Sequence, residues 1–161
     1  MCHCHKARRK EIMSYHLVQG FNNTIGFEIE NNKVILIEFN PSKTISDEDT
    51  PLSVLTNNQI TEYLSNKLMV LSFPVETKVS HFTSLVLAEL RNIPVGETIS
   101  YQQLAVKIGF PNASRAVGKA CGRNPLPLYY PCHRVIRKDG ELGGFSGGIK
   151  IKKWLLDLEK K

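Results

Sequence analysis

One cysteine in the sequence stands in a setting that suits nucleophilic chemistry. Cys132 lies between Pro131 and His133, and Arg134 follows directly. A thiol reacts as its thiolate, which forms with a pKa of about 8.5 in a free cysteine. His133 is the right type of residue to take the thiol proton, directly or through a water molecule, and Arg134 adds positive charge nearby. The alternative is a buried, inert cysteine that packs as a small apolar side chain. The pattern nominates Cys132 as a nucleophile but names no substrate.

The elements around this cysteine are predicted to be mostly helical. Ser100 and Gln103 form a capping box for one helix, which Gly109 ends. Asn112 is expected to cap the next helix, which runs to about residue 121. Helix, four-residue turn and helix match a helix-turn-helix, although any pair of short helices can mimic that pattern. Two apolar stripes predict further helices: Val79, Phe82, Val86, Leu90 and Ile93, and then Ile151, Trp154, Leu155 and Leu158.

The first half of the chain predicts a small β-sheet. Apolar residues alternate over 25–29 and run almost continuously over 34–39. Asn31 and Asn32 suit the hairpin turn between them, because asparagine tolerates positive φ. Residues 15–18 are expected to pair alongside this hairpin.

A loop and a helix are expected to follow the sheet. Residues 40–51 are polar and contain two prolines, which predicts a loop. Asn57 or Asn58 is expected to cap a helix whose apolar residues recur at helical spacing. A domain boundary is expected near residues 70–77. The predicted organisation is an extension over 1–12, an N-terminal domain over 13–74 and a second domain over 77–161.

Composition and charge narrow the class of protein. The chain has 161 residues, of which 42% are apolar, and this is globular composition. Its formal net charge of +6 is uneven: residues 13–114 carry six bases against ten acids, and residues 115–161 carry eleven against four. A basic segment suggests a polyanionic partner, whereas the alternative is an ordinary solvated surface. No apolar run approaches the ~20 residues of a membrane-spanning helix.

The amino terminus is expected to add neither a signal nor a metal site. Residues 1–10 have no apolar stretch typical of a secretory signal, so an intracellular protein is expected, cytoplasmic in a bacterium and nuclear in a eukaryote. Cys2, His3, Cys4 and His5 are metal-ligand types, but immediate neighbours cannot easily wrap one tetrahedral ion. We therefore predict no metal.

The stretch around Cys132 resembles the active-site signature of the O-6-alkylguanine-DNA alkyltransferases, the methylated-DNA–protein-cysteine methyltransferases. Five further segments resemble family segments in the same order and spacing, so the resemblance covers about residues 77–159. The signature and these segments are Pro131-Cys132-His133-Arg134-Val135, Ser100-Tyr101-Gln102-Gln103-Leu104-Ala105, Ser114-Arg115-Ala116-Val117-Gly118, Asn124-Pro125, Gly143-Gly144-Phe145-Ser146-Gly147-Gly148, and Lys152-Lys153-Trp154-Leu155-Leu156 with Glu159.

The resemblance implies a fold and a function. The fold is α+β: a small ribonuclease H-like β-sheet-plus-helix domain, followed by a mostly helical, winged helix-turn-helix-like alkyltransferase domain. The function is DNA repair by direct reversal, in which Cys132 takes the alkyl group of O-6-alkylguanine once and the protein is spent. O-4-alkylthymine is a further candidate substrate. The implied partner is double-stranded DNA that contains alkylated guanine, bound by a monomer without a cofactor.

The resemblance also assigns roles to single residues. Glu159 orients His133, which activates Cys132 through a water molecule. Tyr101 donates a proton toward the guanine ring, and Asn124 holds the turn before the active-site strand.

Further roles concern the DNA, since chemistry on a stacked base requires the nucleotide to be flipped out. Arg115 enters the vacated stack, and small residues on its helix permit close approach to the DNA. The Val135 backbone contacts the guanine edge or the ribose, and so does Ser146. The implied DNA- and base-binding residues are Ser114, Arg115, Ala116, Gly118, Arg123, Val135, Phe145 and Ser146.

Some positions depart from the family pattern, and two other functions compete. Phe145 stands where the family usually has tyrosine, and Tyr129 and Tyr130 stand at typically aliphatic positions. The first alternative is a DNA-binding module, either a transcription factor or a lesion sensor. Alkyltransferase-like sensors carry tryptophan in place of the reactive cysteine, so Cys132 argues against that function. The second alternative is a cysteine hydrolase, which turns over many times.

Overall fold

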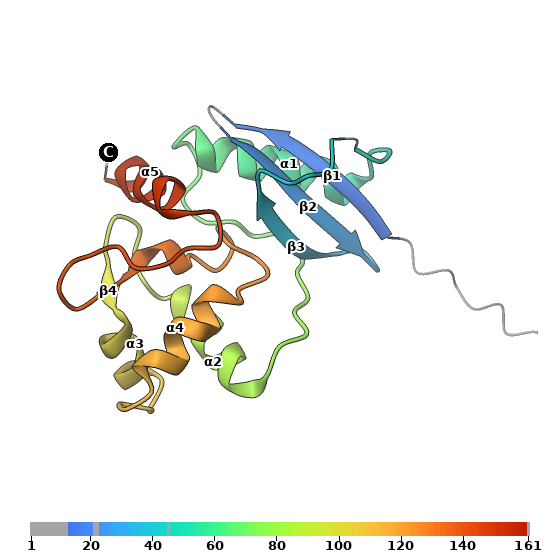
Figure 1. Cartoon of the computed structure of the whole chain (residues 1–161). Helices are drawn as coiled ribbons and strands as arrows, with labels where there is room; N and C mark the ends of the chain where they lie inside the picture. Colours follow the sequence, from blue (N-terminus) through green and yellow to red (C-terminus); the bar gives the residue numbers. More distant parts are fainter. Residues whose placement is uncertain (1–12, 21–22, 45, 161) are drawn as a thin grey trace, which may run out of the picture.

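The computed structural model describes residues 13–20, 23–44 and 46–160 (Figure 1). In this part of the chain, a three-stranded antiparallel sheet and one helix are followed by four helices and a pair of short parallel strands. The elements are β1 (Met13–Gln19), β2 (Thr24–Glu30), β3 (Lys33–Phe39), α1 (Pro51–Leu64), α2 (His81–Leu90), β4 (Ile99–Ser100), α3 (Tyr101–Lys107), α4 (Ser114–Gly122), the 3-10 helix η1 (Cys132–Arg134), β5 (Val135–Ile136) and α5 (Ile149–Glu159).

The sheet has the predicted hairpin and the predicted third strand. β2 lies between β1 and β3, and its Phe27 is opposite His16 on one side and Ile37 on the other. Asn31 and Asn32 form the turn with φ values of 50° and 60°, which asparagine tolerates better than most residues. Alternating apolar residues of the sheet are therefore buried against α1.

Helix α1 begins earlier than the sequence predicted. Its N-cap is Thr50, whose hydroxyl accepts from the backbone N–H of Ser53 in a capping box, and Pro51 occupies the first turn. The prediction that Asn57 or Asn58 caps this helix is wrong. Threonine followed by proline is itself a helix-start signal, and it extends the helix back over a first turn that the apolar stripe does not mark.

The helix pair α3 and α4 follows the prediction except at one cap. Ser100 and Gln103 form the predicted capping box, and Gly109, with φ 83°, follows the end of α3. The N-cap of α4 is Ala113, which makes no side-chain capping bond, so the prediction that Asn112 caps this helix is wrong. The backbone N–H of Ala113 donates to the carbonyl of Phe110 at 2.9 Å, and this tight turn places Asn112 before the cap position.

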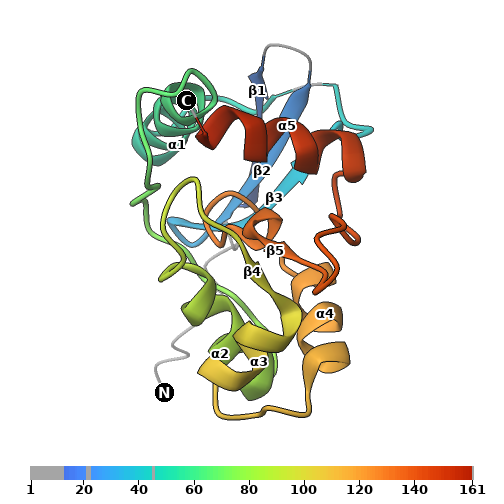
Figure 2. The same ribbon diagram turned by 90° about the vertical axis from the view of Figure 1, so that its left-hand side faces the viewer.

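The last helix packs back against the first half of the chain. One apolar cluster combines sheet residues such as Ile25 and Phe27 with Ile151 and Leu155 of α5. Figure 2 shows α5 lying beside the sheet and α1, above the short strands β4 and β5. A second cluster joins α2, α3 and α4 and includes Cys132. Cys132 thus belongs to the second cluster, and Tyr130 and Phe145 pack against both clusters.

The remaining expectations concern the extension over 1–12, metal binding and membrane-spanning helices. The extension over 1–12, with Cys2 to His5, lies outside the described residues. Within residues 13–20, 23–44 and 46–160, no three His, Cys, Asp or Glu side chains are grouped to hold a metal ion. In the same ranges, no helix has both the length and the apolar character needed to cross a membrane.

Candidate active site

Cys132 is a buried thiol held by an asparagine. It begins η1, and its side chain is enclosed by the apolar cluster of α2, α3 and α4. The Nδ2 of Asn124 donates to the Cys132 Sγ at 3.2 Å. A hydrogen bond to sulfur favours the thiolate over the thiol, so Asn124 offsets part of the cost of forming a buried anion.

Asn124 also ties together the turn that leads to Cys132. Its Nδ2 donates to the carbonyl of Tyr130 at 2.8 Å, and its Oδ1 accepts from the backbone N–H of Leu126 at 3.0 Å. Leu128, in the middle of this turn, has φ 74°, a conformation that a non-glycine residue rarely adopts. One buried side chain thus fixes the turn and touches the thiol.

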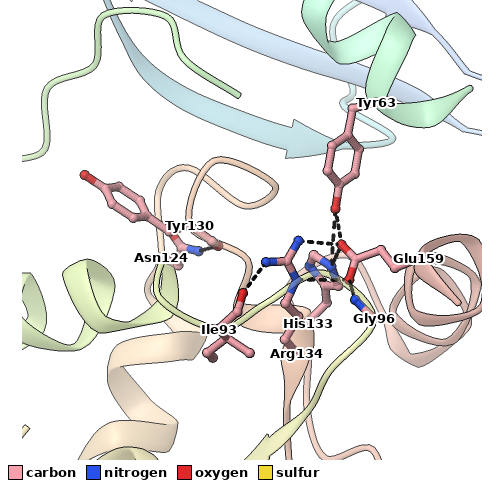
Figure 3. A network of polar contacts seen from close by, with 8 residues as sticks. All are labelled: Tyr63, Ile93, Gly96, Asn124, Tyr130, His133, Arg134 and Glu159. Carbon is pink, nitrogen blue, oxygen red and sulfur yellow. Dashed lines mark hydrogen bonds and ion pairs between the residues drawn. The ribbon is translucent and has the colours of Figure 1, made fainter. Parts of the chain in front are cut away.

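The His133 side chain reaches Glu159 of α5. Its Nε2 lies 2.8 Å from Oε1 of Glu159, and both side chains are buried (Figure 3). An ionised carboxylate only accepts hydrogen bonds, so Nε2 carries the hydrogen and Nδ1 remains an acceptor. Nδ1 is buried and has no partner among the described residues. Burial lowers the pKa of His133, which keeps the ring neutral near pH 7.

The guanidinium of Arg134 binds the carboxylate of Glu159. Its Nε donates to Oε2 of Glu159 and its Nη2 to Oε1, both at 2.9 Å. Its Nη1 donates to the carbonyl of Ile93 at 2.6 Å. The expectation that Arg134 supplies positive charge to Cys132 is therefore wrong, because its guanidinium binds Glu159 and the Ile93 carbonyl, and the pKa of the thiol is lowered by Lys152 instead. Hydrogen bonds from His133 and Arg134 hold the pKa of Glu159 well below its usual range, against the effect of burial.

The cation that acts on the thiol is instead Lys152. Burial raises the pKa of the Cys132 thiol, while the hydrogen bond from Asn124 and the charge of Lys152 lower it. Lys152 is fully buried, and its Nζ donates to the carbonyls of Val135 at 2.6 Å and Gly144 at 3.3 Å. The net effect favours the protonated thiol at neutral pH, so the reaction of Cys132 requires a base.

A hollow of about 540 Å³ opens between α3, α4 and the Gly-rich loop. Tyr101 and Phe145 line it, and both also pack against the cluster that contains Cys132. Its volume falls within the range of about 300–1,000 Å³ that is usual for ligand sites. The lining residues are Tyr101, Gly118, Gly122, Arg137, Gly143, Gly144, Phe145 and Ser146.

Tyr101 connects the hollow with the nucleophile. Burial, with the nearby thiols Cys121 and Cys132, raises the pKa of Tyr101 to about 12, so its hydroxyl keeps its proton. A Cβ on Gly143 would stand 2.9 Å from the Tyr101 hydroxyl, and Gly143 itself has φ 69°. Only glycine fits here, which explains the Gly-rich loop as a device for close approach.

The structure separates the predicted DNA-binding residues into two places. Arg115 and Ala116 are exposed on α4, Ser114 begins that helix, and Gly118 lines the hollow. Arg123 lies elsewhere, since it lines a smaller hollow with Glu30, Lys78 and Pro125, among others.

The sequence matches a protein-family model described as 6-O-methylguanine DNA methyltransferase, DNA binding domain, over residues 81–161. The inducible methylated-DNA–protein-cysteine methyltransferase of Bacillus subtilis is 43% identical over 125 residues, 76% of this chain and 68% of that protein. The crystal structure of the Mycobacterium tuberculosis O6-methylguanine methyltransferase matches with a TM-score of 0.83 and 30% identity, over 92% of this chain and 93% of that one. The structure of the same organism's OGT in complex with DNA matches with a TM-score of 0.78 and 32% identity, over 91% and 92%.

The chain belongs to the methylated-DNA–protein-cysteine methyltransferase family.

Within this methyltransferase, the sequence pattern missed two side chains of the site. Tyr63 of α1 donates a hydrogen bond to Oε1 of Glu159 and lies 3.4 Å from Nε2 of His133. It lies outside the matched family model, and in the sequence it looks like one more apolar position of α1. Lys152 is a charged residue on the buried face of α5. In the sequence, only its position next to Ile151 and near Leu155 could have indicated that it is buried.

Proposed function

We propose that this methyltransferase repairs DNA by direct reversal, transferring a methyl or other alkyl group from the O-6 atom of guanine to Cys132. The observation that carries the proposal is the position of Cys132. It is buried next to a carboxylate-bound histidine, in the apolar cluster against which Tyr101 and Phe145 pack, and both of these residues also line the hollow. A buried thiol with a hydrogen-bond donor on sulfur and a neutral base beside it suits a nucleophile that reacts once with a substrate brought to it.

The proposed reaction is a single displacement at the alkyl carbon. His133 takes the thiol proton at Nδ1 through a water molecule, while Glu159 holds the Nε2–H. The thiolate sulfur forms a bond to the alkyl carbon, and the bond from that carbon to O-6 breaks. The electron pair of the broken bond goes to the guanine, which takes a proton from the Tyr101 hydroxyl. Guanine is restored, and Cys132 becomes a thioether that no group of the site removes.

The titration of the three groups supports these roles. His133 is neutral because burial lowers its pKa, so it can accept a proton. Tyr101 is protonated because its pKa is raised to about 12, so it can donate one. Burial keeps Cys132 as a thiol until the base acts. A resting thiolate would react with other electrophiles, whereas a buried thiol is unreactive until a substrate fills the hollow.

The substrate base must leave the duplex to reach Cys132, since the thiol is buried. We place the DNA against the exposed side of α4, with Arg115 in the vacated stack and Ser114, Ala116 and Gly118 along the close approach. The α3–α4 pair is the helix-turn-helix unit of this proposal. Phe145 packs on the base in the hollow, and the backbone of Val135, together with Ser146, contacts the guanine edge or the ribose.

The proposal extends to the fold of the two domains, the state of the protein and its substrates. We take the N-terminal domain as ribonuclease H-like and the second domain as winged helix-turn-helix-like. We expect the protein to act as a monomer on double-stranded DNA that contains alkylated guanine, with O-4-alkylthymine as a further candidate substrate.

The experiment that tests the function counts methyl groups. Excess duplex DNA carrying labelled O-6-methylguanine is incubated with the protein, and the label on each component is measured. The proposal predicts one methyl group per protein molecule and no further turnover. Label released as methanol, with many turnovers, would support the hydrolase, and binding without transfer would support a lesion sensor. Either result overturns the proposal.

A further inference from the structure

The carboxylate of Glu159 gathers more donors than orienting His133 requires. Its Oε1 accepts from His133, Arg134 and Tyr63, and its Oε2 accepts from Arg134 and, at 3.4 Å, from the backbone N–H of Gly96. An ionised carboxylate offers about four lone-pair sites, so every site is occupied. Four of these five bonds come from the second domain, and the fifth comes from α1.

Tyr63 donates the fifth hydrogen bond from a fixed, buried position. It lies in the last turn of α1 with its ring packed in the apolar cluster of the sheet, and its side chain is buried. Figure 3 shows its hydroxyl pointing down from α1 onto Glu159, beside the His133 ring. Interaction with Glu159 and burial both raise the pKa of Tyr63, so the phenol is always a donor.

We propose that Tyr63 is a positioning residue for the Glu159–His133 pair, which makes the N-terminal domain part of the active site. This inference rests on the proposed function and deepens it. The hydroxyl fixes Oε1 in place and draws negative charge away from it. The carboxylate then holds the His133 Nε2–H without pulling strongly enough to favour a second proton on the ring.

Removal of the Tyr63 hydroxyl should raise the pKa of His133. Glu159, Tyr63 and Arg134 face His133 at its Nε2 edge, Lys152 acts on it from the same helix as Glu159, and Cys132 precedes it. Arg134 and Lys152 lower the pKa of His133, and Glu159 raises it. Without the Tyr63 hydroxyl, Oε1 carries more negative charge, so the pKa of His133 rises. A protonated His133 cannot accept the thiol proton.

The test compares Tyr63→Phe with a matched control. Tyr15 is also a buried tyrosine of the N-terminal domain, and its hydroxyl also donates to a carboxylate, Glu38, at 2.7 Å. Tyr15→Phe therefore removes the same kind of bond away from the site. The readouts are the single-turnover rate with free O-6-alkylguanine base as a function of pH, which leaves DNA binding out, and the titration of His133 followed by NMR.

We expect Tyr63→Phe to slow transfer about tenfold, as for a group that orients a reacting one, and to move the acidic limb of the pH–rate profile and the pKa of His133 to higher pH. Tyr15→Phe should leave rate, profile and pKa unchanged. If Tyr63→Phe lowers only thermal stability and keeps the wild-type profile and pKa, the proposal is overturned while the proposed function stands. If the wild type itself transfers nothing, the proposed function has failed.

A second substitution covers the case in which Tyr63→Phe does not fold. 3-Fluorotyrosine at position 63 keeps the ring and makes the hydroxyl a stronger donor. It should shift the pKa of His133 downward, opposite to the effect of phenylalanine. An unchanged or raised pKa would contradict the role of Tyr63.

Discussion

The substitution Glu159→Gln tests whether one buried carboxylate organises the site. Its side chain is 3% exposed, and that of its ionic partner Arg134 is 5% exposed. Glutamine has the same shape but only one accepting oxygen, and its amide nitrogen faces Arg134 in either orientation, because Arg134 donates to both carboxylate oxygens. The change therefore leaves the guanidinium of Arg134 buried without its counter-charge, which typically costs about 3–5 kcal/mol.

That cost is large for a protein of this size. Typical domains unfold with about 5–15 kcal/mol, so the variant should fold but with a clearly reduced midpoint. At about 2–4 °C per kcal/mol, the melting temperature should fall by roughly 6–20 °C. Urea unfolding and calorimetry measure both quantities. Transfer should also slow, because His133 loses the acceptor that fixes its tautomer.

The control for this variant is Asp157→Asn, the same chemical change two residues earlier on α5 at an exposed position. It should change the free energy of unfolding by less than about 0.5 kcal/mol. If Glu159→Gln also stays within about 1 kcal/mol of the wild type, the network around Glu159 does not hold the site together and the reasoning is wrong.

The pKa of Glu159 is depressed in the folded protein, so stability should depend on pH. The contribution of Glu159 to the free energy of unfolding is complete above its unfolded-state pKa of about 4.3 and is lost as the pH falls below that value. Unfolding measured from pH 7 to 3 should show this loss, and Glu159→Gln should show a smaller one. Asn124→Ala removes bonds to Cys132 and to two backbone groups, so it should cost about 1–3 kcal/mol and slow transfer; an unchanged rate would show that the Sγ contact is idle. Arg115→Ala should slow transfer from duplex DNA more than from the free base, and equal slowing would exclude the base-flipping role. DNA affinity should fall as salt rises, with a linear dependence of log K on log salt concentration; affinity independent of salt would contradict docking on the basic segment.

The sequence predicted best those features that arise from local signals. The hairpin at Asn31-Asn32 and the capping box of Ser100 and Gln103 each depend on a few neighbouring residues, and the structure has both. Two helix starts differ from the prediction, because asparagine is a good capping residue but α1 begins at Thr50-Pro51 and α4 begins at Ala113.

The site combines residues that are adjacent in the sequence with residues that are distant, and only the adjacent ones could be predicted from local patterns. Cys132 and His133 stand together in the sequence, so their chemistry could be predicted. Glu159 required the family resemblance, because 25 residues separate it from Arg134. Tyr63 is 96 residues away from Glu159 in the sequence, and only the apolar cluster that α1 shares with α5 brings its hydroxyl to the carboxylate. Arg134 was misread because its position in the chain does not reveal the direction of its side chain.

The position of the modified sulfur tests the account most directly. Two buried free cysteines, Cys121 and Cys132, lie in the same apolar cluster. Burial raises the pKa of both thiols, that of Cys121 to about 12, but only Cys132 receives the Asn124 hydrogen bond on its sulfur. After reaction with DNA containing O-6-methylguanine, peptide mass mapping should find a single methyl group on Cys132 and none on Cys121. Methylation of Cys121, or of both residues equally, would contradict the account.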